Sequence, residues 1–254
     1  MNATVEKLPK IFVPPERDDL SSNAHRQLIG YLGLLLPLLL WLIAGWRHTE
    51  GLQAWKPLSS VSAYYYTGAV AAFTGILVAL ALFLFTYRGY DNESRIRDRI
   101  AAIIAGIAAI FVAFFPTGVP DNLKPLSWWT PVLGTIHYCS AVVLFGSFIF
   151  FALFLFRKSG KKRTKSLPRG KVVRNTIHIF CGAAMLACML WAGIATIVDA
   201  PIFWPEVLAL EFFAISWLAK GRADVTAVAT GKWSLHYGRH PRRLFADLRK
   251  LITA

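Results

Sequence analysis

The sequence contains few acidic residues and few cysteines. Its 254 residues include 14 Asp and Glu against 28 Lys and Arg, and three Cys, at positions 139, 181 and 188. The cysteines lack zinc-type spacing and fall within apolar blocks, so we expect buried thiols. About 26 mostly polar residues precede the first apolar block, and no small-residue cleavage site follows it, so we expect no cleavable signal peptide.

Charged residues are also scarce within six long stretches of the chain. Hydrophobic residues make up 56% of the sequence and are concentrated in these stretches. A helix needs about 20 apolar residues to cross roughly 30 Å of hydrocarbon, and a segment in lipid must satisfy its own backbone hydrogen bonds. The sequence therefore predicts an all-α, polytopic membrane helix bundle with six transmembrane helices. The expected spans are 27–46, 66–87, 100–117, 132–156, 174–198 and 202–219.

Three regions follow from these blocks. Residues 1–26 form a polar amino-terminal tail, residues 27–219 form the six-helix transmembrane domain, and residues 220–254 form a basic tail. Within this last region, the segment after Pro241 has apolar and basic residues on opposite faces, as in a helix that lies in the headgroup plane or docks on the protein's own loops.

The basic residues predict the orientation of the bundle. The two tails, the second loop and the fourth loop hold 25 Lys and Arg, whereas the other three loops hold 3. Short loops rich in Lys and Arg remain in the cytoplasm. We therefore expect an inner (plasma) membrane protein with both termini cytoplasmic (N-in/C-in). Because the net charge of +14 follows this alternation, we expect contact with anionic headgroups and not with nucleic acid.

Small and aromatic residues add two expectations about packing. Residues 71, 75 and 79 of the second span and 101, 105 and 109 of the third are Ala or Gly spaced four apart, which favours close pairing of these spans. Five tryptophans are predicted to lie at the outer boundary and to form an aromatic belt. They are Trp46, Trp55, Trp128, Trp129 and Trp204.

Polar residues gather in the predicted outer half of the bundle. The second span begins with the segment SSVSAYYYT, which includes Ser62 and Tyr65. The fifth span ends at Asp199, and the sixth begins with Glu206. Each has a structural alternative: Tyr65 as belt material, Asp199 as a helix end or cap, and Glu206 as a first-turn carboxylate that complements the helix dipole. The functional alternative is that these residues line a ligand-binding pocket.

His137 and Glu211 are the candidates for chemistry. Glu211 lies near the middle of the sixth span, where an acidic side chain costs about 2.5 kcal/mol or more unless it faces the bundle interior, is protonated or is paired. His137 lies at a similar depth in the fourth span, so the two could form a catalytic proton-transfer pair. A divalent metal ion held by His137, Asp199 and Glu211 is a further possibility. His137 as a structural histidine is the alternative.

Four segments carry a family resemblance. With SSVSAYYYT, LFTYRGYD, FFPTG and IHYCSA, residues 28–200 resemble a group of bacterial six-span membrane proteins of unknown function, and more distantly the Frag/DRAM membrane proteins. The resemblance implies a six-span fold but no reaction. A fainter similarity to the alkaline ceramidase and progestin-receptor superfamily implies a zinc site of Ser, Asp and three His. The chain lacks the seventh span and the paired histidines of that family, so we do not expect a zinc amidase.

Three functions are compatible with this pattern. The first is an outer-leaflet polar pocket that binds, and in one version modifies, a lipid or other amphiphile. The second is a non-catalytic membrane subunit or scaffold with a protein partner, or a homo-oligomer. The third is a small proton-coupled transporter that uses His137 and Glu211. The sequence names no substrate, and whether the protein is an enzyme is left open.

Overall fold

The computed structural model describes residues 17–47, 51–87, 89, 95–121, 123–158 and 169–221. These residues form helices and connecting loops, with no strand among them. The six α-helices are α1 (Arg17–Trp46), α2 (Val70–Thr86), α3 (Arg95–Phe114), α4 (Pro131–Phe150), α5 (Arg169–Ile197) and α6 (Phe203–Lys220). A 3₁₀ segment, η1 (Ser62–Tyr66), precedes α2, and a π-helical turn, η2 (Phe151–Leu155), extends α4.

The apolar blocks thus fold as the expected helices, with most boundaries shifted by up to about five residues. The exception is α1, which begins at Arg17, ten residues before the expected span and within the segment expected to be a polar tail. The second helix begins at Val70 rather than at 66, because Ser62–Tyr66 is a separate 3₁₀ turn. Three helical segments are long and apolar enough to cross a membrane: Asn23–Trp46, Pro131–Leu155 and Val172–Ile197. Val70–Thr86 is apolar but shorter. Most of the basic tail, including the segment after Pro241, lies outside the described residues.

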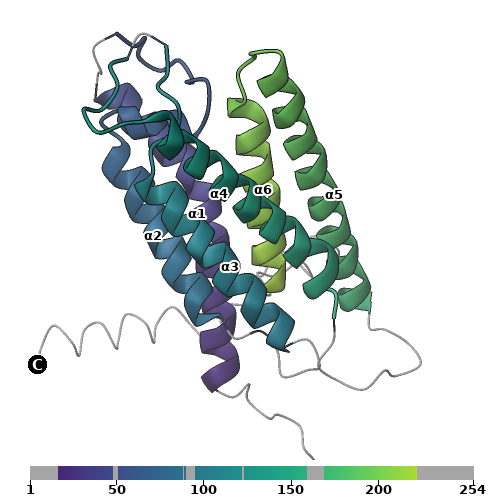
Figure 1. Ribbon diagram of the computed structural model, residues 1–254. Coiled ribbons are helices and arrows are strands. Elements are labelled where there is room, and N and C mark those ends of the chain that lie inside the picture. The colour runs from purple at the N-terminus through teal and green to yellow at the C-terminus, as the bar shows by residue number, and fades with distance from the viewer. Residues whose placement is uncertain are drawn as a thin grey trace, which may run out of the picture.

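The helices run alternately up and down, so that their connections lie at two ends of the bundle (Figure 1). We call the end with the α1–α2, α3–α4 and α5–α6 loops the aromatic end, because Trp46, Trp55, Trp128 and Trp204 are exposed there. We call the other end, where α1, α3 and α5 begin, the basic end.

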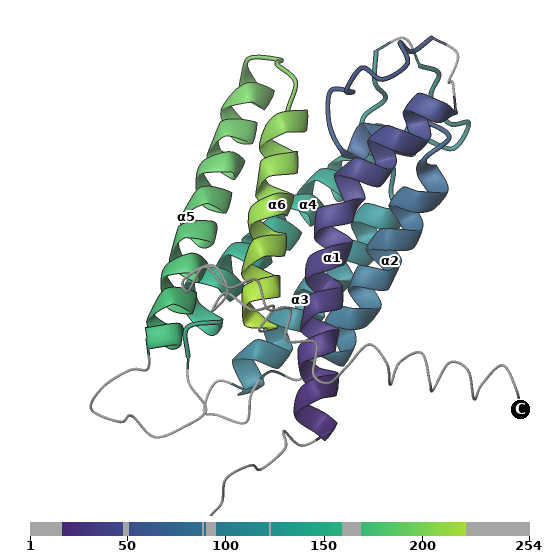
Figure 2. The same ribbon diagram turned by 180° about the vertical axis from the view of Figure 1, so that it is seen from behind.

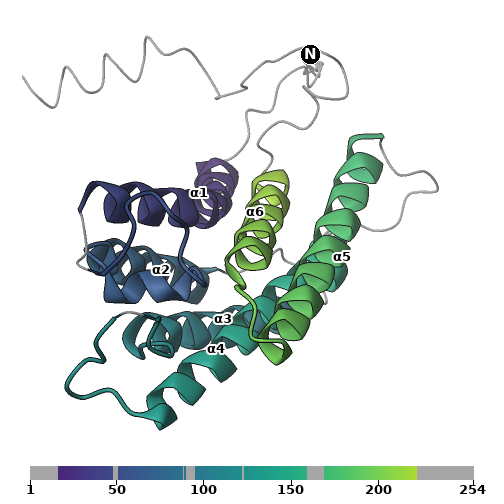
Figure 3. The ribbon, with the colours of Figure 1, turned by 90° about the horizontal axis from the view of Figure 1, so that it is seen from above.

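Helix α6 closes the bundle by packing between α5 and α1 (Figures 2 and 3). The remaining neighbours follow chain order, with α1 against α2, α2 against α3 and α3 against α4. Toward the inside of the bundle, α6 presents an aromatic face. Phe213 stacks on Phe148 of α4 with ring centroids 3.8 Å apart, and Trp217 contacts Phe151 of η2 and Tyr87 at the end of α2.

The expected pairing of the second and third helices is confirmed, but only one of its two small-residue ridges is buried. On α3, Ala101, Ala105 and Ala109 lie in the core. On α2, Ala71 and Gly75 are exposed, and Phe73, Leu77, Leu80 and Leu84 are buried instead. Large side chains of α2 therefore pack against a surface of small residues on α3, as when Phe85 covers Gly106.

Small residues also allow α1 and α6 to approach closely. A Cβ added at Gly30 would lie 2.8 Å from Leu218 Cγ and 3.1 Å from the carbonyl oxygen of Ala214. Gly33 faces Phe213 in the same way. Close approach at small residues is a common basis of helix association in lipid, so these glycines hold α6 in place.

We therefore expect Gly30→Leu to destabilise the bundle, because the added side chain meets both a side chain and backbone of α6. Overpacking of this kind costs about 1–3 kcal/mol. Thermal unfolding in detergent measures the effect. Gly75→Leu is the matched control, since a Cβ at Gly75 meets nothing within 4 Å. An equal loss in both variants would contradict the close packing of α1 on α6.

Candidate functional site

The residues just before η1 are joined to the start of α6 by two hydrogen bonds at the aromatic end. The Val61 amide donates to a carboxylate oxygen of Glu206 at 2.6 Å. The Ile202 amide, at the start of α6, donates to the Ser59 carbonyl oxygen at 2.7 Å. Both Val61 and Glu206 are buried. Glu206 therefore binds another segment of the chain and does not act only as a charge in the first turn of its own helix.

The other side of η1 is tied to the turn that follows α3. Helix α3 ends at Phe114, and Pro116 cannot continue it, so the last carbonyl groups need other donors. The Tyr66 hydroxyl donates to the Thr117 carbonyl oxygen at 2.7 Å, and the Trp129 indole donates to the same oxygen at 3.0 Å. The Tyr65 hydroxyl lies 3.5 Å from the carbonyl oxygen of Phe114.

His137 of α4 also bonds to the turn that follows α3. Its Nδ1 lies 2.6 Å from the Phe115 carbonyl oxygen, which can only accept, so Nδ1 carries the proton. The ring is 2% exposed, and its other nitrogen, Nε2, is buried without a partner among the described residues. His137 thus has a structural bond to the turn after α3, and one nitrogen lone pair that no described residue uses.

These contacts bring together three of the four segments that carry the family resemblance. SSVSAYYYT supplies the tyrosines, FFPTG supplies the carbonyl oxygens, and IHYCSA supplies His137. Tyr87, from LFTYRGYD, lies in the core beside Trp217 instead. We call the assembly of η1, the turn after α3, His137 and Glu206 the η1 site.

Of the remaining predicted site residues, Ser62 belongs to the η1 site, whereas Asp199 and Glu211 are not joined to it by hydrogen bonds. Ser62 is buried within η1, but Asp199 is exposed in the turn between α5 and α6. Asp199 has φ +54°, a left-handed conformation that Asp tolerates better than most residues. It lies two residues after the end of α5 at Ile197, and it does not cap α6, which begins without a side-chain cap.

Glu211 faces away from the bundle interior. It is half-buried and lies on a stripe of α6 with Leu208 and Ile215, which are 39% and 44% exposed. Phe213, which stacks on Phe148 of α4, lies two residues away and so projects from nearly the opposite side of α6. The expected pairing of Glu211 with His137 is therefore not formed, and Glu211 makes no hydrogen bond to a described residue.

The metal site suggested by the sequence is not assembled either. Within the described part of the chain, no group of three or more His, Cys, Asp or Glu side chains is placed to hold a metal ion. His137 bonds to the turn after α3, Asp199 is exposed at the end of α5, and Glu211 faces outward. The prediction of a metal held by these three residues is corrected accordingly.

Sequence reasoning missed a polar cluster at the basic end. Arg26 donates to the Asn23 side chain at 3.0 Å, and Lys220 donates to the Phe156 carbonyl oxygen at 3.1 Å. His178 Nδ1 and the Ser216 hydroxyl lie 2.9 Å apart. Arg26, Lys220, His178 and Ser216 are all buried, as is Asp98 in the first turn of α3. The available signal was the presence of His178 and Ser216 on otherwise apolar segments.

The contact between Glu206 and Val61 yields a test of the η1 site. Glu206→Ala leaves the buried Val61 amide without an acceptor, which costs about 1–3 kcal/mol. Glu206→Gln keeps an oxygen acceptor and is expected to lose less. Thermal unfolding in detergent compares both with Glu211→Gln, a control that alters a carboxyl group without a described partner. Unchanged stability of Glu206→Ala would contradict the role of this bond.

Comparisons with known proteins do not add a relative. No protein-family model matches the chain, and neither the curated proteins nor the solved structures contain a significant match. The resemblance to six-span bacterial proteins and the Frag/DRAM group therefore remains a prediction.

Proposed function

We propose that the protein is a six-span inner-membrane protein with both termini in the cytoplasm. Three helices are long and apolar enough to cross a membrane, and α2, α3 and α6 lie alongside them in the same bundle. The shortest, α2, has 17 residues, near the lower limit of about 17 for a span. The distribution of 25 Lys and Arg against 3 supports the orientation, because it places the basic end inside.

This topology predicts which positions react with a membrane-impermeant maleimide. Single cysteines are introduced after Cys139, Cys181 and Cys188 have been replaced by alanine. In intact spheroplasts we expect Ser127→Cys and Ala200→Cys, in loops of the aromatic end, to react fully. Arg157→Cys, at the basic end, should react only after permeabilisation. Labelling of Arg157→Cys in intact spheroplasts together with protection of Ser127→Cys would reverse the orientation.

We further infer that the protein is a non-catalytic membrane subunit whose partner binds the outward stripe of α6. The observation that carries this proposal is Glu211, a carboxyl group in the middle of a helix on a face where Leu208 and Ile215 are exposed. Acidic side chains at this depth are rare and usually pair, because leaving one in hydrocarbon costs about 2.5 kcal/mol or more. A second protein that covers the stripe would supply the missing partner.

Charge complementarity indicates the chemistry of that partner. Glu211 is matched by a transmembrane helix with a Lys, Arg or His side chain at mid-membrane depth. A second copy of this chain fits less well. In the described helices, Lys and Arg side chains lie near the ends rather than in the middle turns. His137 and His178 lie within spans, but both are buried and bonded inside the bundle, so a second copy offers Glu211 no outward-facing cation. We therefore favour a different protein as the partner.

The η1 site supports the amphiphile-binding function less well. Glu206, Tyr66 and His137 already use polar atoms in bonds within the chain. A hollow next to η1, between Trp41, Trp55 and Tyr64, has about 20 Å³ of internal space, which suits a single water molecule and not a headgroup. The unpartnered Nε2 of His137 is the observation that keeps outer-leaflet amphiphile binding as the second candidate.

A photo-cross-linking amino acid at position 208 tests the subunit function in native membranes. We expect one adduct of defined mass, joined to a transmembrane helix of another protein that has a Lys, Arg or His near its middle. The same amino acid at position 75, on the exposed face of α2, is the control and should give no such adduct. Glu211→Leu should lower the yield at position 208 at least fivefold, and Glu211→Gln should lower it less.

Two results would contradict this function. One is an adduct formed between two copies of this chain. The other is a yield at position 208 that Glu211→Leu leaves unchanged. Exchange of charges provides the positive control: Glu211→Lys should lose the adduct, and an acidic residue in place of the partner's basic residue should restore it.

A further inference from the structure

A separate groove runs along the outside of the bundle between α3 and α4. It has a volume of about 390 Å³, and its walls include Ile100 and Ile104 of α3 and Val143 and Phe150 of α4. These four side chains are between 40% and 53% exposed. They face outward, so in a membrane this groove opens directly to lipid.

The groove exists because small residues form its floor. Ala101 of α3 and Gly146 of α4 both line it. A Cβ added at Gly146 would meet nothing within 4 Å, so the space next to it is open. The larger side chains of the two walls extend further outward than these two small residues, so each wall ends in an apolar rim.

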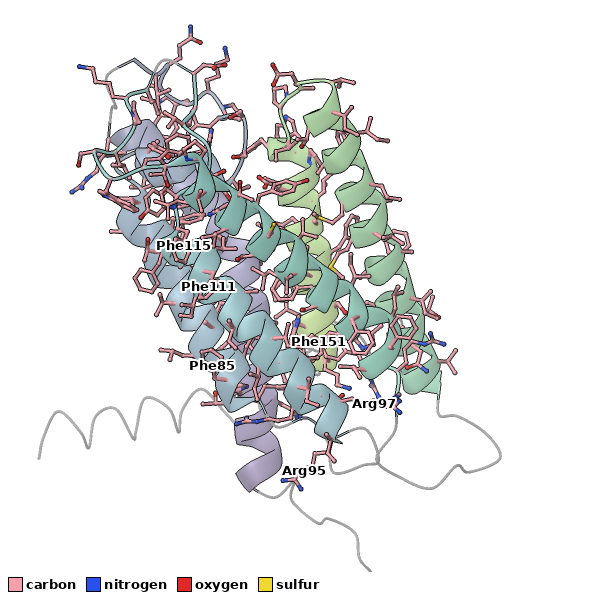
Figure 4. The ribbon with its side chains drawn as sticks, viewed as in Figure 1. Phe85, Arg95, Arg97, Phe111, Phe115 and Phe151 are labelled. Carbon is pink, nitrogen blue, oxygen red and sulfur yellow. The ribbon has the colours of Figure 1, made fainter. Side chains whose placement is uncertain are left out.

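Arg97 lies at the basic end of the groove and gives it a charged terminus (Figure 4). It is exposed, and it has no hydrogen bond or ion pair with a described residue. Arg99, two residues on, differs in this respect, because its guanidinium donates to the Phe85 carbonyl oxygen at 2.6 Å. The guanidinium of Arg97, which lines the groove, is thus available to a ligand.

The spacing fits one leaflet of a bilayer. Seven residues separate Arg97 from Ile104, which at 1.5 Å per residue corresponds to about 10 Å along α3. One leaflet contributes about half of the roughly 30 Å hydrocarbon thickness. With Arg97 at headgroup level, the apolar walls therefore extend over much of the depth of an acyl chain.

We propose that this groove binds one anionic phospholipid of the leaflet at the basic end. Its phosphate pairs with Arg97, and one acyl chain lies on Ala101 and Gly146 between the rims. The apolar walls select hydrocarbon and the arginine selects negative charge, so neither a zwitterionic lipid nor a free phosphate matches both features. Only the identification of this leaflet as the cytoplasmic one rests on the topology proposed above.

Native mass spectrometry of the full chain in detergent tests the site. The delipidated protein is titrated with phosphatidylglycerol, phosphatidylcholine or glycerol 3-phosphate. We expect one phosphatidylglycerol adduct at a concentration several-fold below that needed for phosphatidylcholine, and no adduct with glycerol 3-phosphate. Arg97→Gln should weaken phosphatidylglycerol binding about fivefold and phosphatidylcholine binding less, because the choline cation offsets the charge of its phosphate. Gly146→Leu, which fills the groove, should remove the adducts of both lipids.

Two matched variants control for charge and volume. Arg95→Gln removes the same charge from the same turn but does not line the groove, and Gly75→Leu adds the same side chain to an open position on α2. Both should bind phosphatidylglycerol like the wild type. Equal affinity for the two lipids, equal effects of Arg97→Gln and Arg95→Gln, or a protein dimer that Gly146→Leu abolishes would each overturn the proposal. None of these outcomes bears on the partner expected at Glu211.

Discussion

In a bundle of apolar helices, a backbone amide or carbonyl that lies outside a helix must find its partner elsewhere in the same chain. The aromatic end is built around this constraint. The turn after α3 leaves the carbonyl groups of Phe115 and Thr117 outside the helix, and the amide of Val61, the residue before η1, also lies outside a helix. His137, Tyr66 and Glu206 bond to these three groups. Because they come from α4, η1 and α6, satisfying the backbone also fixes the relative positions of these elements.

The same constraint explains which features of the fold could be predicted from the sequence. Apolar blocks determine which segments become helices, so most helix ends were predictable to within about five residues. The start of α1 was not, because this helix extends ten residues into the polar segment before its apolar block. The rotation of each helix about its own axis was not predictable, because it depends on the helices that pack against it. The stacking of Phe213 on Phe148 and the contact of Trp217 with Phe151 orient α6. That orientation places Glu211 outside, although depth alone suggested a pair with His137.

The charged residues gave a similarly incomplete prediction. Lys and Arg were counted loop by loop and interpreted as topology signals. This interpretation assumes that each of these side chains is exposed. Arg26 and Lys220 are instead buried, and each also lies over an aromatic ring, of Tyr87 and of Phe156 respectively. The π-helical turn at the end of α4 leads directly to Phe156, whose carbonyl oxygen accepts from Lys220. No sequence pattern indicates that a lysine at the end of a span, such as Lys220, will be buried and bonded to a carbonyl oxygen at the end of another helix.

Burial separates polar groups that hold the fold from those available to other molecules. Inside the bundle, the polar side chains of the η1 site and of the basic-end cluster bond mainly to other parts of the chain. In the η1 site, the Nε2 of His137 and the hydroxyl of Tyr64 have no hydrogen-bond partner among the described residues. Glu211 and Arg97 lie on outward faces, and they differ in depth. A lipid headgroup can reach Arg97, in the first turn of α3, but it cannot reach Glu211 at the middle of α6 without leaving the interface. Depth therefore assigns the two positions to different kinds of ligand, a phospholipid at Arg97 and a protein helix at Glu211.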